Sequence, residues 1–121
     1  MSNDFLNVFL NEMKTNVNGF IAVAVTEIES GLSFGNLTVD PGFDPELAAA
    51  VKAKLSAVKA LNLNQDIEDI LITLSNQIHI IDISPNKKFM IYLAADSTKA
   101  NLGMTRAILR KHKLELEKNL A

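Results

Sequence analysis

The chain has 121 residues, a net charge of −2 at neutral pH and no cysteine. Its length corresponds to one domain, residues 1–121, with enough side chains for a hydrophobic core. The composition excludes disulfides and Cys-type zinc sites, and it gives no electrostatic reason to expect a nucleic acid as partner.

Near the N-terminus, apolar residues recur at intervals of three and four, which predicts an amphipathic helix. These residues are Phe5, Leu6, Phe9, Leu10, Met13 and Val17. Asn3 or Asp4 can cap the start of this helix, and Asn18-Gly19 can end it.

Two segments rich in β-forming residues follow, at residues 20–27 and 32–39. Ser30-Gly31 between them is typical of a two-residue hairpin turn, because glycine accepts a positive φ. Gly35 inside the second segment indicates a bulge or a close approach by a neighbouring group.

Asp44-Pro45 predicts the start of a second helix, which runs to about Leu61. One side of this helix is apolar, with Leu47, Val51, Leu55 and Val58. A second side consists of small residues, with Ala49, Ala53, Ala57 and Ala60, and it is rimmed by Lys52, Ser56 and Lys59.

Three strands in close succession are predicted at residues 67–75, 77–83 and 88–95. Both faces of these strands are largely apolar. In the third, for example, Phe89 and Ile91 alternate with Met90 and Tyr92. We therefore expect helices on both faces of the sheet.

Asp96-Ser97-Thr98 can cap a last helix that ends near Asn119. Its apolar side includes Leu102 and Leu109, whereas Arg106, Arg110 and Lys113 are expected to face water. The order α-β-β-α-β-β-β-α predicts an α+β fold with a single five-stranded antiparallel sheet.

Motifs for catalysis or metal binding are weak, so we expect no enzyme and no cofactor. His79 and His112 have no second ligand at metal spacing and are interpreted as packed residues. Asp40, Asp44 and Glu46 lack the spacing of an EF-hand. The glycines form no nucleotide-binding loop.

The charges near the third predicted strand have simple structural interpretations. Asp66, Glu68 and Asp69 could form an acidic patch, but such charges more often blunt a sheet edge or solvate the end of a strand. The longest apolar run, residues 20–25, is far below the roughly 20 residues of a membrane span. Without a signal-peptide pattern at residues 1–4, we expect a cytoplasmic protein with no membrane insertion.

The row of alanines in the second predicted helix has two interpretations. Alanine is a good helix former on an exposed face. Small side chains also let two helices approach closely, and a self-complementary row suits a two-fold axis. The residues themselves leave both interpretations open.

Element order and two short motifs resemble the roadblock family, the dynein light-chain type of domain found also in bacterial GTPase regulators. Asn101-Leu102-Gly103, at the start of the last helix, is similar to that family's Asn-Leu-Gly segment. Ser30-Gly31-Leu32 is similar to its Asp-Gly turn, with Ser30 as a mild departure. The resemblance covers nearly the whole chain and implies a roadblock/profilin-like architecture.

The resemblance implies a homodimer in which the third strands pair across a two-fold axis and the second helices pack antiparallel over the sheet. It also implies a non-enzymatic adaptor that binds a Ras-like small GTPase, or a complex containing one, without Arg106 or Arg110 as an arginine finger. The implied dimer interface consists of Ala49, Lys52, Ala53, Ser56, Ala57, Ala60, Asp69, Leu71 and Thr73.

A small-molecule sensor of the PAS or GAF type is the alternative, since its sheet follows a related order of strands. About 27 residues separate the second and third predicted strands, and they hold one helix. A ligand pocket would require convergent polar groups, which the sequence does not indicate.

Overall fold

The computed structural model describes residues 2–40 and 68–120. The helix predicted at residues 44–61, with its row of alanines, lies outside these residues. The elements in chain order are α1 (Ser2–Asn16), β1 (Phe20–Glu27), β2 (Ser33–Thr38), β3 (Asp69–Thr73), β4 (Gln77–Ile83), β5 (Phe89–Asp96) and α3 (Leu102–Leu120).

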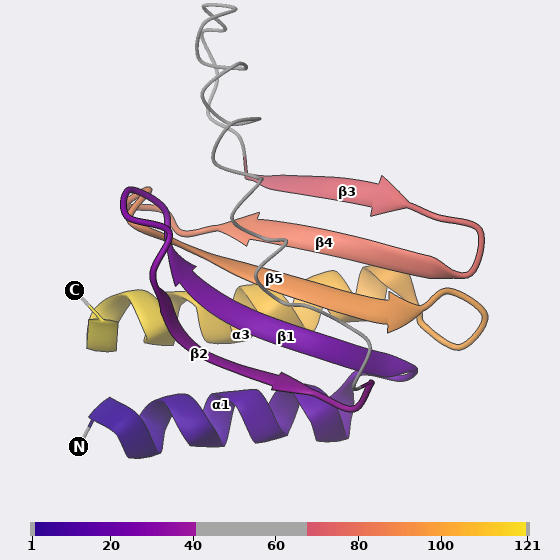
Figure 1. The fold of residues 1–121 in the computed structure, drawn as a ribbon, viewed down its shortest axis with the longest axis horizontal. Helices are drawn as coiled ribbons and strands as arrows, with labels where there is room; N and C mark the ends of the chain where they lie inside the picture. The colour runs from indigo at the N-terminus through magenta and orange to yellow at the C-terminus, as the bar shows by residue number, and fades with distance from the viewer. Residues whose placement is uncertain (1, 41–67, 121) are drawn as a thin grey trace, which may run out of the picture.

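The strands form one five-stranded sheet in the order β2-β1-β5-β4-β3, and all neighbouring strands are antiparallel. β5 lies at the centre, and β2 and β3 form the two edges (Figure 1). The predicted α+β class and the antiparallel five-stranded sheet are confirmed.

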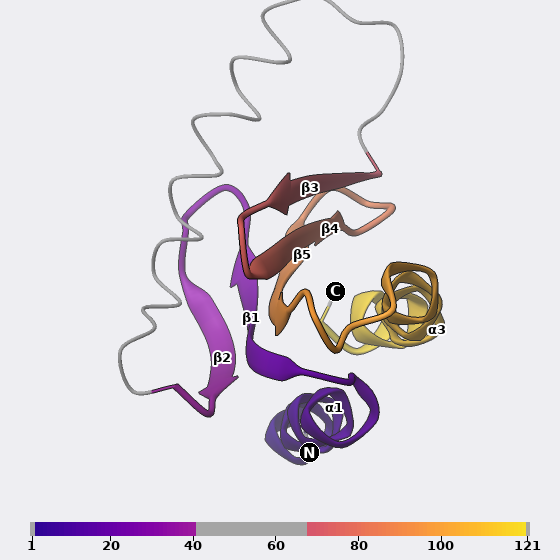
Figure 2. The ribbon, with the colours of Figure 1, turned by 90° about the vertical axis from the view of Figure 1, so that its right-hand side faces the viewer.

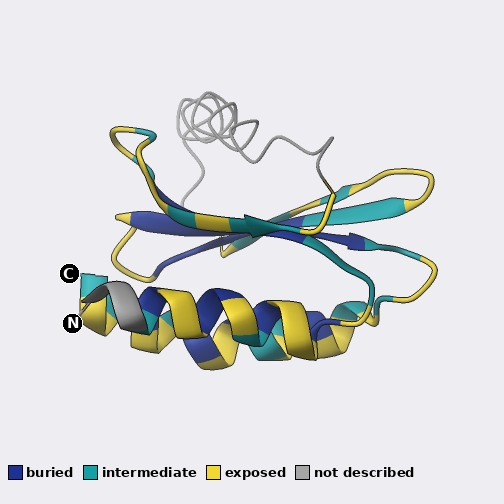
Figure 3. Ribbon diagram, turned by 60° about the horizontal axis from the view of Figure 1, so that its bottom comes forward, coloured by how far each residue is buried: buried dark blue, intermediate teal, exposed yellow. Residues whose placement is uncertain are grey.

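Helices α1 and α3 lie side by side on the same face of the sheet and run in opposite directions (Figures 1 and 2). Their inner sides are buried against the strands, and their outer sides are exposed (Figure 3). The expectation of helices on both faces is thus confirmed for one face. The remaining predicted helix, at residues 44–61, lies outside the described residues.

The strands alternate between two apolar clusters, as the sequence predicts. On the helix side, Ile80, Ile91 and Leu93 pack with residues of α1 and α3 such as Phe9 and Leu109. On the other side of the sheet, a second cluster of buried residues is formed by Ala24, Ile81, Met90, Tyr92 and Ala94.

Three local predictions need correction. The connection between β1 and β2 spans residues 28–32 rather than a two-residue turn, although Gly31 has the expected positive φ of 76°. Asn3 and Asp4 lie inside α1, which begins at Ser2.

The N-cap of α3 was also predicted too early. Asn101 caps this helix, since its Oδ1 accepts a hydrogen bond from the Met104 N–H at 3.0 Å. Asp96 instead accepts hydrogen bonds from the N–H and hydroxyl groups of Thr98, at 2.9 and 2.7 Å, in the preceding turn.

Gly35 allows α1 to pack closely against β2. A Cβ atom at this position would lie 2.8 Å from Cδ2 of Leu6. The pairing of β1 with β2 also shifts between Val25 and Thr26, next to the Val25–Gly35 pair. The sequence-based expectation of a bulge or a close approach at this glycine is confirmed on both counts.

Among the described residues, no helix is long and apolar enough to cross a membrane.

Gly19 and Gly31 provide a matched pair for testing backbone constraint. Both have positive φ, 75° and 76°, but a Cβ at Gly19 would lie 3.0 Å from the carbonyl oxygen of Asp96, whereas Gly31 has open space around it. We expect Gly31→Ala to lower the free energy of unfolding by about 1 kcal/mol and Gly19→Ala by about 3 kcal/mol. Urea denaturation measures both values, and equal losses would contradict the proposed crowding at Gly19.

Candidate functional site

β3 forms an edge of the sheet, and within the described part of the chain it pairs with β4 alone. Two hydrogen bonds at the ends of this pair show which residues of β3 exchange backbone hydrogen bonds with β4. The Leu74 N–H donates to the Gln77 carbonyl at 2.8 Å, and the Ile83 N–H donates to the Glu68 carbonyl at 3.0 Å. Residues of β3 at even positions therefore direct their backbone groups toward β4.

The odd-numbered residues Asp69, Leu71 and Thr73 consequently direct their backbone N–H and C=O groups toward the open side of β3. These are the three strand residues predicted for the dimer interface. Their side chains lie on the helix face of the sheet, because Leu71 is paired with Ile80 of the helix-side cluster. Leu71 is 37% exposed.

The other six predicted interface residues cannot be placed in the same way. Ala49, Lys52, Ala53, Ser56, Ala57 and Ala60 all lie in residues 41–67, outside the described residues.

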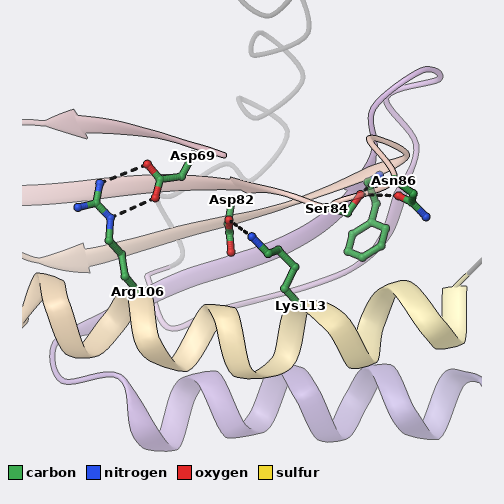
Figure 4. A network of polar contacts seen from close by, with 7 residues as sticks. Asp69, Asp82, Ser84, Asn86, Arg106 and Lys113 are labelled. Carbon is green, nitrogen blue, oxygen red and sulfur yellow. Dashed lines mark hydrogen bonds and ion pairs between the residues drawn. The ribbon is translucent and has the colours of Figure 1, made fainter. Parts of the chain in front are cut away.

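Asp69 is held from below by α3 (Figure 4). Nε and Nη2 of Arg106 donate to Oδ2 and Oδ1 of Asp69 at 3.1 and 3.2 Å, which is a two-pronged ion pair. The prediction that Arg106 faces water is therefore wrong. This pair joins the open-edge strand to α3.

A second ion pair lies next to the first, since Asp82 of β4 is directly opposite Asp69 of β3. Nζ of Lys113 donates to Oδ1 of Asp82 at 3.0 Å, so Lys113 was also wrongly predicted to face water. Arg110, between the two cations in α3, is exposed as predicted. Arg106 and Lys113 reach their carboxylates from opposite directions along the helix (Figure 4).

Asp82 is only 5% exposed, and within the described structure its Oδ2 has no hydrogen-bond partner. Burial raises the pKa of the Asp82 carboxyl, and Asp69 adds to this effect, although Lys113 and Arg110 oppose it. Because this pKa is raised in the folded state, the ionised carboxylate costs stability at neutral pH. That cost is relieved as the pH falls through the pKa of Asp82.

His79 and Tyr92 form a polar pair on the opposite face of the sheet. The Tyr92 hydroxyl contacts Nδ1 of His79, while Nε2 contacts Oε1 of Gln77 at 2.9 Å. Burial lowers the pKa of His79 and raises that of Tyr92 to about 12, so both side chains are neutral at pH 7. The interpretation of His79 as a packed residue is confirmed.

His112 joins the two helices. Its ring is 9% exposed, lies edge-on to Phe9 with 5.8 Å between ring centroids, and brings Nε2 to 3.1 Å from Oε2 of Glu12. This residue too is a packed residue, at the contact between α1 and α3. The described residues include no group of three or more potential metal ligands.

No family model and no curated protein sequence matches the chain. Solved structures do. A structure of MglB in a tetrameric arrangement aligns with a TM-score of 0.84 and 17% identity, over 98% of this chain and 89% of that one. The gliding protein MglB from Thermus thermophilus aligns with a TM-score of 0.83 and 17% identity, over 98% of this chain and 90% of that one.

A Roadblock/LC7 domain from Streptomyces avermitilis aligns with a TM-score of 0.68 and 10% identity, over 91% of this chain and 96% of that one. The chain has a roadblock-type fold. The predicted resemblance to the roadblock family is confirmed at the level of the fold.

The Asp82–Lys113 pair can be tested with one single variant and one double variant. Lys113→Met leaves a buried carboxylate without its cation, so we expect the free energy of unfolding to fall by about 3 kcal/mol. Adding Asp82→Leu removes the carboxylate and should recover most of that loss, since an apolar pair of similar volume replaces a buried ion pair at little cost. Urea denaturation of both variants measures this, and a double variant as unstable as Lys113→Met would contradict it.

Proposed function

We propose that this chain is a non-enzymatic homodimeric adaptor of the cytoplasm. It binds a Ras-like small GTPase, or a complex that contains one, and modulates or scaffolds that partner. The observation that carries the proposal is the open edge of β3, whose backbone groups are directed outward at Asp69, Leu71 and Thr73 on a roadblock fold.

The chemistry of β3 favours pairing with another strand. Edges that must remain single usually carry lysine, proline or a bulge. The described edge has a regular register over its five residues, and its one charged side chain, Asp69, is paired with Arg106 of α3. Leu71, at the centre of the strand, adds an exposed apolar side chain.

A second contact between the two copies is proposed for the predicted helix at residues 44–61. Its row of small residues, Ala49, Ala53, Ala57 and Ala60, would allow two helices to cross closely. Lys52 and Ser56 would lie at the rim of this contact. The tetrameric arrangement of MglB shows that a protein with this fold self-associates, which supports the proposal.

The assignment of a small GTPase as partner rests on the resemblance to the roadblock family. Two features agree with an adaptor role. His79 and His112 are both occupied in packing contacts, so neither is positioned as a free general base. The weakly acidic chain also favours a protein partner over a nucleic acid.

A proline scan of the two sheet edges tests the proposed dimer. Leu71→Pro removes an N–H that faces the open side of β3, so the fold should tolerate it while strand pairing between copies is lost. Asn36→Pro is the matched control, because Asn36 faces the open side of β2. Light scattering should give a dimer for the wild type and for Asn36→Pro, and a monomer for Leu71→Pro. A monomeric wild type would instead favour the sensor alternative.

The helix contact is tested separately with Ala53→Glu. A charge at a close helix crossing would be buried without a partner, at a cost of several kcal/mol to the dimer. We expect the dissociation constant to rise at least a hundredfold by analytical ultracentrifugation, with circular dichroism unchanged. Lys54→Glu, which belongs neither to the alanine row nor to its rim, is the control. An unaltered dimer with Ala53→Glu would show that the alanine row is not part of the dimer contact and faces solvent.

A further inference from the structure

We infer that two copies pair along β3 with Leu71 opposite itself on the two-fold axis, and that Arg106 makes this register possible. The inference rests on the proposed homodimer and specifies its register, which neither the fold nor the sequence pattern alone determines. In this register Asp69 of one copy lies opposite the partner's Thr73.

The backbone phase restricts which residues can exchange hydrogen bonds across the axis. Within β3 as the structure describes it, Asp69, Leu71 and Thr73 direct their N–H and C=O groups outward. An axis through Leu71 places each of these residues opposite another outward-facing residue, and each opposed pair can exchange two hydrogen bonds. The whole length of β3 is then paired.

The side chains match on both faces in this register. On the helix face, Leu71 contacts its own copy, and Thr73 can donate its hydroxyl to the partner's Asp69. On the other face, Ile70 lies opposite the partner's Ile72, and both residues are half-buried in this structure. Cross-strand pairs of branched apolar residues are favourable in antiparallel sheets.

Shifted registers are worse for specific reasons. An axis through Asp69 would pair β3 at that residue alone, because each later residue of the strand would face a residue that precedes it. An axis through Ile70 places Asp69 opposite the apolar Leu71. An axis through Ile72 places Asp69 opposite Ser75, which lies beyond the end of β3.

Arg106 contributes by controlling Asp69. Asp69 already lies opposite Asp82 within its own copy, so an unpaired carboxylate at Asp69 would be repelled from the strand. The two hydrogen bonds from Arg106 neutralise Asp69 and hold its side chain on the helix face. The edge of β3 that faces the second copy therefore carries no net charge, because Arg106 balances the charge of Asp69. Arg106 is a positioning residue, since it acts on the interface through Asp69.

Because the chain has no cysteine, single cysteine variants report the register directly. Leu71→Cys places two thiols on residues with Cα atoms about 5.5 Å apart, within the range of a disulfide. Thr73→Cys is the matched control, because its two copies would lie about 13 Å apart along the strands. Ile70→Cys tests a register shifted by one residue.

Under mild oxidation at the dimer concentration, we expect Leu71→Cys to become a covalent dimer while Thr73→Cys and Ile70→Cys remain largely uncrosslinked on a non-reducing gel. Faster crosslinking of either control would overturn the register and leave the homodimer intact. A dimer by light scattering in which Leu71→Cys does not crosslink would also overturn it. A monomeric wild type would overturn the proposed function itself.

The role of Arg106 is tested on the dissociation constant. We expect Arg106→Gln to raise this constant about tenfold, as for loss of one charged hydrogen-bonded partner. Adding Asp69→Asn should restore it, because the carboxylate that needed Arg106 is gone. Arg110→Gln, one turn further along α3 and exposed, should have no effect. Equal weakening by Arg106→Gln and Arg110→Gln, or no rescue by Asp69→Asn, would overturn this role.

Discussion

The pattern of hydrogen bonds between β3 and β4 determines which backbone groups of β3 are available to another molecule. Once the Leu74–Gln77 and Glu68–Ile83 contacts are formed, every second residue of β3 has its backbone groups committed to β4. The remaining residues face outward. The strand's period of two then places the side chains of those same residues on the helix face. Asp69 therefore both borders the open edge and contacts α3.

Two ion pairs link α3 to the sheet and set its position along the strands. Arg106 binds Asp69, and Lys113 binds Asp82. Asp69 and Asp82 are direct cross-strand neighbours in a non-hydrogen-bonded pair, about 4.5 Å apart between Cα atoms. Arg106 and Lys113 are seven residues apart, which corresponds to about 10 Å along the helix. A shift of α3 by one turn would bring one cation closer to its carboxylate and carry the other out of reach.

The strands could be predicted from the sequence because their signals are local. β1 and β4 begin and end as predicted, and the two faces of β5 alternate as the side chains indicate. The N-cap of α3 could not be chosen in this way, since Asp96 and Asn101 are both good caps. Backbone contacts decide: Asp96 donates its N–H to the Gly19 carbonyl, which holds Asp96 at the end of β5.

The ion pairs were missed for a different reason. Arg106 and Lys113 lie outside the apolar stripe of α3, and a helical pattern alone assigns such residues to water. The signal that could have found them is in the strands, where Asp69 and Asp82 occupy positions on the buried helix face. A carboxylate at such a position requires a cation, and the flank of α3 that faces β3 supplies both.

The difference between the two edges of the sheet decides what kind of assembly can form. If β2 of one copy paired with β3 of the next, each addition would leave a new open edge, and the chain of copies would grow without limit. β2 is poorly suited to this. Its pairing with β1 is interrupted between Val25 and Thr26, and the Thr38 hydroxyl bonds the backbone of Asp40 at its end. Such irregularities twist an edge away from a flat partner. β3 has a regular register, so the favoured contact is between two identical edges, and that contact closes after two copies.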